Sequence, residues 1–560
     1  MREAEALAQI IEALAQEGFV WRRGSNPPTF EGSMAIGERS LRLEIVFSRL
    51  DFTMLPRVRL LDRATELPGH RAHVEDDAIC YSSPGTLVLD MYEPGRHALT
   101  VLRLARRTLG DILSGEAEVD LAIEFPQHWR DANLVHVALP RDAPAGRASV
   151  ARLERLGAVP ALVLARRTGS DDILDLGAFG IFRGAGSAAY LAVTDKALSV
   201  RQGEVLPGNL ADFLGWAGRV DPALPDSLMH GLFAARGRAM LFVQGPNGCV
   251  GAAPCPPETW QQTKRDPDLM ARMLRAHPER VPVLRLRGNP ADTGHVMARN
   301  LVGAPTLARR RVAVVGCGTI GGHLAKFLAQ SGAGVGGGRL DLIDSETLLP
   351  ANLGRHWLPA RWVACSKALA CAAEIRATFP HSDVAGHPGD VLLDPDVLDG
   401  AELVIDATGE QPISAVLNDR MVQRADGAAL LLVWLRGMGA AAQALLVPSA
   451  GDGRGCYRCL RPDLGSWSAG DVMAPHATMV EAPASCGEAA FLPYGVAAPA
   501  VAAGLGARMA LEWAGGRVSP SLRTIRLDLA ETVPVEDTDL PTDSSCPACS
   551  PFRAPCQEKA

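Results

Sequence analysis

Three glycines and one aspartate have the types and spacing that nucleotide binding requires. Gly316, Gly318 and Gly321 form a G-x-G-x-x-G run, whose missing side chains let the chain turn tightly and let its N–H groups approach phosphate oxygens. Asp344 ends the next apolar segment, where a carboxylate can hold a ribose hydroxyl. Since 56 of the 560 residues are glycine, such a run can occur by chance. It indicates a nucleotide site only because apolar segments typical of strands flank it.

Polar residues after Asp344 distinguish adenylation from the chemistry of NAD and FAD enzymes, which share this glycine run. An N-L-G-R segment carries Asn352 and Arg355, Lys367 follows, and Asp406 comes after a later apolar segment. Attack of a carboxylate on the α-phosphorus of ATP develops negative charge that cations and Mg²⁺ must stabilise. A dehydrogenase needs no such array. The alternative is that Arg355 and Lys367 are ordinary surface charges.

This stretch resembles the ubiquitin-activating and ThiF/MoeB adenylation family. The resemblance implies that the glycine run binds ATP and that Asp344 binds the ribose. It assigns phosphate binding to Asn352, Arg355 and Lys367, of which Arg355 and Lys367 also act in catalysis, and it assigns magnesium to Asp406. His356 fits the Gln or His that usually follows the arginine. The family also implies a homodimer, in which Arg299 is the candidate for an arginine that reaches across the interface.

Two C-x-x-C pairs supply four thiolates. Cys456 and Cys459 are followed roughly 90 residues later by Cys546 and Cys549, a set that suits tetrahedral structural zinc and leaves no open position for catalysis. The separation is longer than in a compact zinc ribbon, so two redox-active pairs are the alternative from the pattern alone. Members of the adenylation family commonly clip their C-terminal tail with such a pairing, so the resemblance favours Zn²⁺.

Cys486 lies between these pairs, in S-C-G-E. Ubiquitin-activating enzymes take the modifier from its adenylate as a thioester on a cysteine, and the resemblance makes Cys486 the candidate nucleophile. ThiF/MoeB relatives that form no thioester can also carry a cysteine near this position. Both interpretations therefore stay open.

Cys80 is a third candidate thiol, at the end of H-V-E-D-D-A-I-C in a long loop. The stretch resembles a bacterial relative of ubiquitin-conjugating enzymes, whose thioester cysteine follows a His-Pro-Asn motif. Here Arg71-Ala72-His73 stands in that place, one residue closer to the cysteine. We expect His73 to donate a hydrogen bond to the oxyanion, as the family's asparagine does. The alternative is a small buried cysteine at a strand end.

Hydrophobic periodicity predicts the elements that position these residues. Towards the N-terminus it predicts helices over Glu3–Glu17 and Ala98–Leu113 and strands at Leu41–Phe47, Val58–Leu61 and Thr86–Asp90. Around the glycine run it predicts strands at Val312–Val315, Leu340–Ile343 and Leu403–Ile405, and helices over His323–Gln330 and Val496–Trp513. Between them, apolar runs at Ala161–Ala165 and Tyr190–Val193 indicate a folded α/β segment with no catalytic constellation.

Composition excludes several functions. A net charge of −7 over 560 residues gives no reason to expect nucleic acid or a membrane surface as a partner. The sequence has no apolar run near the roughly 18 residues of a spanning helix and no signal-peptide pattern, so we expect a cytoplasmic protein. Twelve cysteines in so long a chain suit metal binding or catalysis better than a disulfide framework.

The predicted fold class is α/β with three domains. Residues 1–140 form an α+β domain like a ubiquitin-conjugating enzyme, 141–290 an α/β connecting domain, and 291–560 a Rossmann-like ThiF/MoeB adenylation domain with a zinc clip. This order resembles bacterial activating/conjugating fusion proteins of anti-phage signalling systems, which attach the C-terminus of a cyclic-nucleotide-synthesising enzyme to cellular targets.

The resemblance implies a relay that uses ATP, Mg²⁺ and Zn²⁺. The C-terminal carboxylate of a ubiquitin-like modifier, or of such an enzyme, is adenylated, passes to Cys486 and then to Cys80, and is ligated to a target lysine. Two alternatives differ in class. A sulphur-carrier adenylase would leave Cys80 without a role, and a non-catalytic nucleotide-binding scaffold would use only the glycine run.

Overall fold

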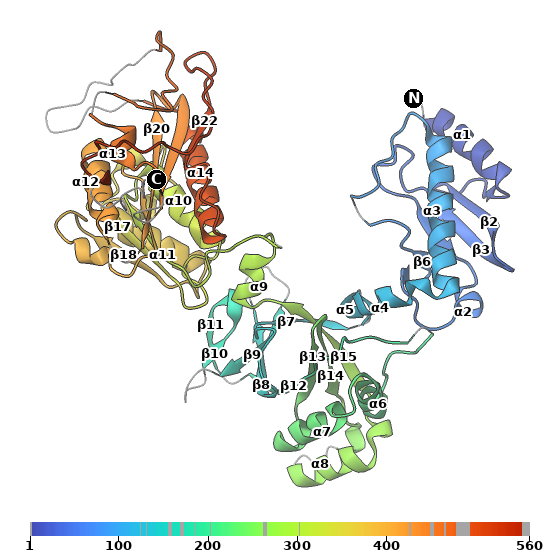
Figure 1. The fold of residues 1–560 in the computed structure, drawn as a ribbon. Coiled ribbons are helices and arrows are strands. Elements are labelled where there is room, and N and C mark those ends of the chain that lie inside the picture. Colours follow the sequence, from blue (N-terminus) through green and yellow to red (C-terminus); the bar gives the residue numbers. More distant parts are fainter. Residues whose placement is uncertain are drawn as a thin grey trace, which may run out of the picture. The chain divides into compact units, whose positions relative to one another are not determined.

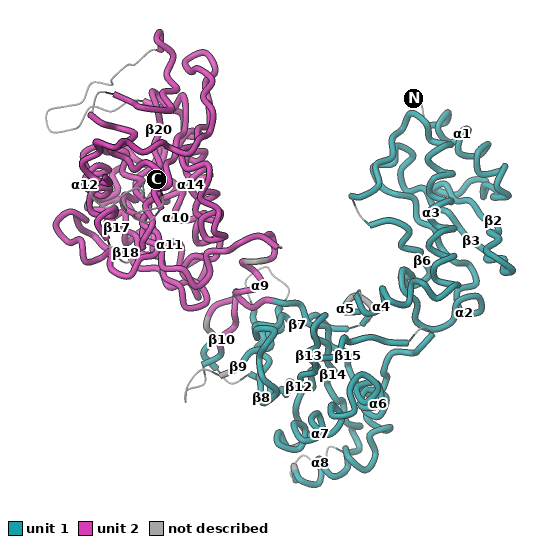
Figure 2. Tube along the Cα trace, viewed as in Figure 1, with its two compact units in different colours: residues 1–174, 182–290 teal, residues 175–181, 291–560 magenta. Residues whose placement is uncertain are grey.

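The computed structural model describes residues 3–83, 85–123, 125–129, 132–154, 160–167, 173–184, 186–201, 203–260, 266–301, 303–424, 427–448, 453–463, 466–477 and 493–550. Residue contacts divide the chain into two compact units (Figure 2). Unit 1 comprises Met1–Leu174 and Phe182–Pro290, and unit 2 comprises Asp175–Ile181 and Ala291–Ala560. None of the helices in the described part is both long enough and apolar enough to cross a bilayer.

Unit 1 begins with an antiparallel sheet covered by two helices (Figure 1). The described strands run in the order β1 (Val20–Trp21), β2 (Thr29–Ile36), β3 (Arg39–Val46), β4 (Arg57–Leu60), β6 (Ala78–Ile79) and β5 (Val74–Glu75). Helices α1 (Glu3–Gln16) and α3 (Pro94–Ser114) pack against each other and share a core with β2 and β3. The predicted helices and the strands at 41–47 and 58–61 are confirmed.

Several strands of this sheet differ from the prediction. The short strands β1, β5 and β6 were not predicted. The segment Thr86–Asp90 is not a strand: the structure gives it turn and irregular backbone, and Val88 is 88% exposed. Strand β2 was not predicted, because Gly32 interrupts its apolar pattern. That glycine is needed where it stands, since a Cβ there would lie 2.6 Å from the ring of Phe19.

The rest of unit 1 is built on a closed barrel. Seven described strands close on themselves, since β9 pairs with β8 as well as with β7; they are β7 (Asn133–Val137), β8 (Gly146–Leu153), β9 (Ala161–Arg167), β12 (Ser187–Val193), β13 (Met240–Gly245), β14 (Gly248–Pro254) and β15 (Val283–Pro290). Short strands β10 (Ile173–Asp175) and β11 (Ile181–Arg183) extend the sheet beyond β9.

Alternate residues of the barrel strands fill two cores. Val135, Leu164 and Phe242 belong to one cluster of buried residues, whereas Leu241 and Val243 belong to another, together with residues of the covering helices. These helices are α6 (Leu210–Val220), α7 (Leu224–Ala234) and α8 (Pro267–Ala276). The strand period of two therefore separates an interior core from a helix-covered face. The apolar runs at 161–165 and 190–193 lie in β9 and β12, so the prediction of a folded α/β segment is confirmed.

Unit 2 contains a mixed sheet whose first five described strands are parallel. Their order is β18 (Val384–Pro388), β17 (Arg339–Asp344), β16 (Arg311–Val315), β19 (Leu403–Asp406) and β20 (Ala429–Arg436). Strands β21 (Ala441–Val447) and β22 (Leu522–Arg526) add to it antiparallel. The strands predicted around the glycine run are confirmed.

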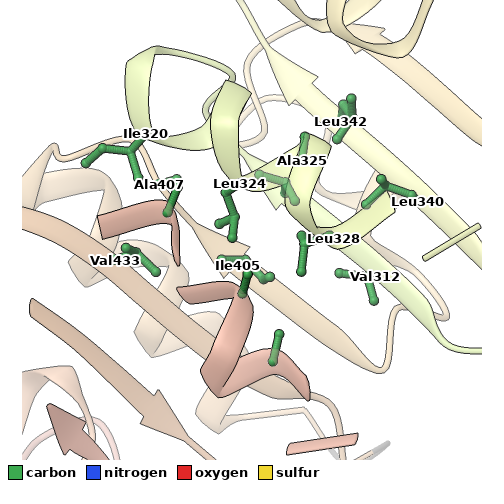
Figure 3. Close-up of a cluster of buried hydrophobic side chains, with 14 of the residues drawn as sticks. Val312, Ile320, Leu324, Ala325, Leu328, Leu340, Leu342, Ile405, Ala407 and Val433 are labelled. Atoms are coloured by element: carbon green, nitrogen blue, oxygen red, sulfur yellow. The ribbon is translucent and has the colours of Figure 1, made fainter. Parts of the chain in front are cut away.

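Helices bury both faces of the parallel strands. Helices α10 (Thr319–Gln330), α11 (Lys367–Thr378) and α14 (Ala497–Ala514) share a core with Val312 and Val314. Figure 3 shows part of this core, with Leu324 and Leu328 of α10 and Val312 of β16. Helix α12 (Gln411–Val422) shares another core with Ala313 and Val315. Strand β16 is thus buried on both faces, which explains why its sequence is an unbroken run of apolar residues. The polar residues of the predicted site lie at the carboxyl ends of the parallel strands, as Asp344 and Asp406 do, or in the loops that follow them.

Candidate active sites

The glycine run makes a tight turn from β16 into α10. Gly316 has a φ of +85°, and a Cβ there would lie 2.9 Å from the backbone of Thr408. A Cβ on Gly321 would lie 1.8 Å from the carbonyl oxygen of Gly316. Gly318 caps the start of α10, and nothing lies within 4 Å of its Cβ position. Two glycines thus allow the fold, and the third leaves open space beside the N–H groups of a helix start, which suits phosphate.

Asp344 fastens this turn to the end of β17. Its carboxylate accepts hydrogen bonds from the N–H groups of Cys317, at 2.6 Å, and Glu346, at 2.7 Å. Burial raises the pKa of this carboxyl above its usual range. Each carboxylate oxygen has a second lone pair, so the group fits a role as acceptor for ribose hydroxyls while it holds the loop.

His356 fastens the N-L-G-R segment to the same turn. Its Nδ1 accepts a hydrogen bond from Leu358 N–H at 3.1 Å, which leaves the proton on Nε2, and Nε2 donates to the carbonyl of Cys317 at 2.8 Å. Burial lowers the pKa of His356, which is consistent with this neutral form. Asn352 has a local role as well, because its Oδ1 accepts from Leu349 N–H at 2.8 Å.

The two predicted phosphate cations have defined surroundings. Lys367 begins α11, is 6% exposed, and places Nζ 2.5 Å from Oε2 of Glu346. The guanidinium of Arg355 lies 5.8 Å from the ring centre of Tyr494, whose hydroxyl lies 3.4 Å from Oγ1 of Thr319 at the start of α10. A buried lysine is not an ordinary surface charge, so the surface-charge alternative is wrong for Lys367.

Asp406 ends β19 and is 2% exposed. Its carboxylate accepts hydrogen bonds from the N–H and Oγ1 of Thr408, at 3.0 and 2.7 Å, and from Oγ of Ser414 at 2.5 Å. Burial raises the pKa of this carboxyl. A buried carboxylate with hydroxyl and amide partners at a strand end fits the oxygen ligands that Mg²⁺ prefers.

The strand register brings these groups to one edge. Val315 pairs with Ile343 of β17 and with Asp406 of β19, so the glycine run and the two aspartates lie at the carboxyl ends of three adjacent strands. Glu346 and Tyr494 were not predicted. Glu346 had a usable signal, as an acid two residues after Asp344, whereas Tyr494 had none. Arg299, beside helix α9 (Thr293–Ala298), is exposed.

The four cysteines of the C-x-x-C pairs meet, and their sulfurs lie within 4.8 Å of one another. Four sulfurs at about 2.3 Å from one zinc ion would be roughly 3.8 Å apart, and the observed separations include 3.6 Å for Cys456–Cys546 and for Cys459–Cys549. Hydrogen bonds from the Cys456 thiol and from Asp543 N–H lower the pKa of Cys459 to about 4. The set therefore fits a structural zinc ion.

Cys80 lies just after the β5–β6 hairpin and is exposed. Its N–H donates to the carbonyl of His73 at 2.8 Å, and the Nε2 of His73 lies 2.9 Å from Oδ2 of Asp120. The buried-cysteine alternative is therefore wrong. Asp120 is another residue that the sequence analysis missed. Cys486 lies outside the described residues.

Comparisons with known proteins agree with this arrangement. The ThiF family model matches residues 297–548, and the Prokaryotic E2 family B model matches residues 3–137. The chain is 30% identical over 570 residues to the ATP-dependent ubiquitin transferase-like protein Cap2 of Pseudomonas aeruginosa, covering 98% of this chain and 100% of the relative.

Other similar proteins match smaller parts of this chain. A protein of the same description from Escherichia coli is 32% identical over 175 residues, which is 30% of this chain and 29% of the relative. The crystal structure of E. coli MccB with ATP aligns with 46% of this chain and 70% of its own, at 16% identity and a TM-score of 0.34. The chain belongs to the family of ATP-dependent ubiquitin transferase-like Cap2 proteins, enzymes that join an E2 domain to a ThiF adenylation domain.

Proposed function

We propose that the chain activates the C-terminal carboxylate of a protein modifier and relays it through two cysteines to a lysine. The modifier is a ubiquitin-like protein or the C-terminus of a cyclic-nucleotide-synthesising enzyme, and the setting is anti-phage defence in the cytoplasm. The observation that carries the proposal is the strand register that places Gly316, Asp344 and Asp406 at one edge. Membership of the Cap2 family supports the coupling to an E2 domain.

In the first step the modifier carboxylate attacks the α-phosphorus of ATP, and pyrophosphate leaves. The turn N–H groups and Asp344 hold the nucleotide, and Asp406 would hold Mg²⁺, which supplies charge for the phosphates. Lys367 is paired with Glu346 in the described structure. We expect the phosphates to replace Glu346 as its partner, and Arg355 to stabilise the same developing charge.

Two thiol steps follow. The Cys486 thiolate attacks the acyl adenylate, which forms a thioester and releases AMP. The Cys80 thiolate then attacks that thioester, and Cys486 leaves as a thiolate. Exposure of Cys80 supports the second step, because a thiol that takes an acyl group from another cysteine needs a reachable sulfur. A homodimer, with Arg299 reaching across it, is part of the proposal.

A gel assay tests the relay. The purified chain is incubated with ATP, Mg²⁺ and a candidate modifier encoded by a neighbouring gene, then run without reducing agent. We expect a thiol-sensitive adduct that survives Cys80→Ala and is lost in Cys486→Ala. Cys255→Ala is the matched control, since Cys255 is also exposed. If a modifier known to be adenylated forms no thioester on either cysteine, the relay is refuted and a sulphur-carrier adenylase is favoured.

A further inference from the structure

Buried polar contacts link the expected magnesium ligand with the cysteine cluster through helix α12. Asp406 accepts a hydrogen bond from Oγ of Ser414, and Nδ2 of Asn418 donates to the sulfur of Cys456 at 3.6 Å. Helix α12 carries both Ser414 and Asn418. Because these two residues are four positions apart, they lie on one face of the helix, one turn from each other. All four residues are buried, so their polar groups need partners inside the protein.

The two oxygens of the Asp406 carboxylate have different surroundings. Oδ1 accepts from the N–H and the hydroxyl of Thr408, at 3.0 and 2.7 Å, and so uses both of its lone pairs. In the described part of the chain, Oδ2 accepts one hydrogen bond, from Ser414 at 2.5 Å. The second lone pair of Oδ2 is therefore the one that suits Mg²⁺. The Ser414 hydroxyl shares this oxygen, so it sets the direction in which that lone pair points.

The amide of Asn418 is fixed at both of its ends. Its Oδ1 accepts from Tyr457 N–H at 2.9 Å, so Nδ2 is the end that faces the sulfur of Cys456. Nδ2 also donates to Oδ1 of Asp419 at 3.2 Å. Hydrogen bonds from outer groups commonly orient metal ligands. Since four thiolates carry more negative charge than one Zn²⁺ neutralises, an N–H donor beside Cys456 should stabilise the occupied cluster.

Two further contacts hold α12 against the first C-x-x-C pair, on either side of the serine. In the first turn of α12, Oε1 of Gln411 accepts from the guanidinium of Arg461 at 2.8 Å. One position after the asparagine, Asp419 accepts two hydrogen bonds from the guanidinium of Arg458, at 3.1 and 2.8 Å. Because the serine lies between these contacts in the sequence, a displacement of the cysteine pair should also displace the turn of helix that carries it.

We propose that Ser414 and Asn418 are positioning residues that couple the cysteine cluster to the magnesium site, an inference that rests on the proposed role of Asp406. Asn418 holds the Cys456 thiolate of the zinc-occupied cluster. The cluster in turn holds α12 in the position from which Ser414 orients the Asp406 carboxylate. Loss of zinc should therefore weaken Mg²⁺ binding as well as lower stability, so the cluster has a role in adenylation and not in folding alone.

Melting of the full chain with ATP tests the contact between Ser414 and Asp406. ATP is added with or without Mg²⁺, and the measured quantity is the part of the rise in melting temperature that requires Mg²⁺. In Ser414→Ala this part should fall by about half or more, as roughly tenfold weaker Mg²⁺ binding predicts. Ser382→Ala is the matched control, because Ser382 is also a buried serine of unit 2 but lies just before the amino end of β18. An unchanged Mg²⁺-dependent rise in Ser414→Ala would overturn the proposal.

Release of zinc to a chromogenic chelator tests the contact between Asn418 and Cys456. In Asn418→Asp the carboxylate can still accept from Tyr457 N–H but cannot donate to the sulfur. We expect this variant to release zinc about tenfold faster than wild type and to show a smaller Mg²⁺-dependent rise in melting temperature. Ser414→Ala should release zinc at the wild-type rate. Release at the wild-type rate from Asn418→Asp would contradict the role of its N–H donor and overturn the proposal.

Removal of zinc tests the coupling itself. Zinc removal from the wild type should reduce the Mg²⁺-dependent rise in melting temperature, and added Zn²⁺ should restore it. In Ser414→Ala the same removal should change this rise little further, because the link is already broken. Independent, additive effects of Ser414→Ala and zinc removal would show two separate sites and refute the coupling. If Asp406→Asn keeps the full Mg²⁺-dependent rise, the proposed magnesium role of Asp406 is itself refuted.

Discussion

His356 donates a hydrogen bond from Nε2 to the carbonyl oxygen of Cys317 at 2.8 Å, across 39 positions of sequence. The bond joins the arginine segment to the middle of the glycine turn. It explains in physical terms why a glutamine or histidine suits this position, since both can offer one donor to a carbonyl and one acceptor to an N–H group. The segment that carries Arg355 and the glycine turn are therefore held in a fixed position relative to each other.

Removing this bond should weaken nucleotide binding. In His356→Ala two buried hydrogen bonds are lost, each worth about 1 kcal/mol, so we expect the KM for ATP in pyrophosphate exchange to rise at least tenfold. His356→Gln should stay within about threefold of wild type, because its amide can replace both bonds. Equal effects of the two substitutions would show that volume, and not hydrogen bonding, matters here.

The same residue should make unit 2 sensitive to acid. Burial lowers the pKa of His356, so below about pH 6.5 the unfolded chain binds a proton that the folded state does not. The free energy of unfolding should therefore fall as pH drops from 7 to 5.5. Denaturant titrations across this range should show a shallower fall for His356→Gln, and parallel slopes would contradict the assignment.

Substitutions of two glycines in the run should distinguish a loss of folding from a loss of ATP binding. Gly321→Ala places a methyl group 1.8 Å from the Gly316 carbonyl oxygen, so we expect loss of soluble protein or a large drop in melting temperature. Gly318→Ala has open space and an ordinary φ of −71°. It should melt within about 2 °C of wild type yet lose pyrophosphate exchange, because its methyl group enters the phosphate space. If this variant retains pyrophosphate exchange, the phosphates of ATP do not lie beside Gly318.

The ionised side chain of Asp406 should lower the stability of the fold while it supports adenylation. Burial raises its pKa, so the native state binds its proton more readily than the unfolded chain, and the ionised carboxylate destabilises the fold at neutral pH. With EDTA present, Asp406→Asn should melt at a higher temperature than wild type, while ATP–pyrophosphate exchange is abolished. Unchanged exchange would remove the magnesium role, and a lower melting temperature would show that the charge is compensated.

The cysteine cluster should bind one zinc ion per chain. Cys546→Ser should lower the zinc content and reduce the melting temperature of unit 2 by about 5 °C or more, since the ion links two segments. Cys255→Ser is the control, because this exposed cysteine lies outside the cluster. Elemental analysis well below one zinc ion per chain in fresh protein would contradict a closed four-thiolate site.

Local sequence patterns predicted the helices and strands whose formation depends mainly on residues close in the sequence. The run Val312–Val315 predicted a doubly buried strand, and the apolar segments before Asp344 and Asp406 predicted that each aspartate ends a strand. The partners of these groups were not predictable in the same way. Asp120 lies 47 positions from His73, and Tyr494 reaches Arg355 only through tertiary folding, so neither leaves a periodic signal.

Errors in the strand prediction have a similar origin. Thr86–Asp90 has apolar residues but pairs with no strand in the part of the chain that the structure describes, and Val88 stays exposed. Gly32 lowers the apparent strand propensity of β2, yet the chain needs it for the close approach of Phe19. Closure of the barrel through β8 and β9 depends on pairing between strands, which residue types alone do not specify.

The first and last strands of the barrel are hydrogen-bonded neighbours with a mechanical consequence. Strands β7 and β15 pair in parallel, from Asn133 with Leu286 to Val137 with Pro290. The chain enters this pair at Asn133 and leaves it at Pro290, at opposite ends. Tension between the flanking domains therefore loads five residue pairs in shear, so that their bonds must break together and not one by one. The barrel should behave under pulling force as a clamp.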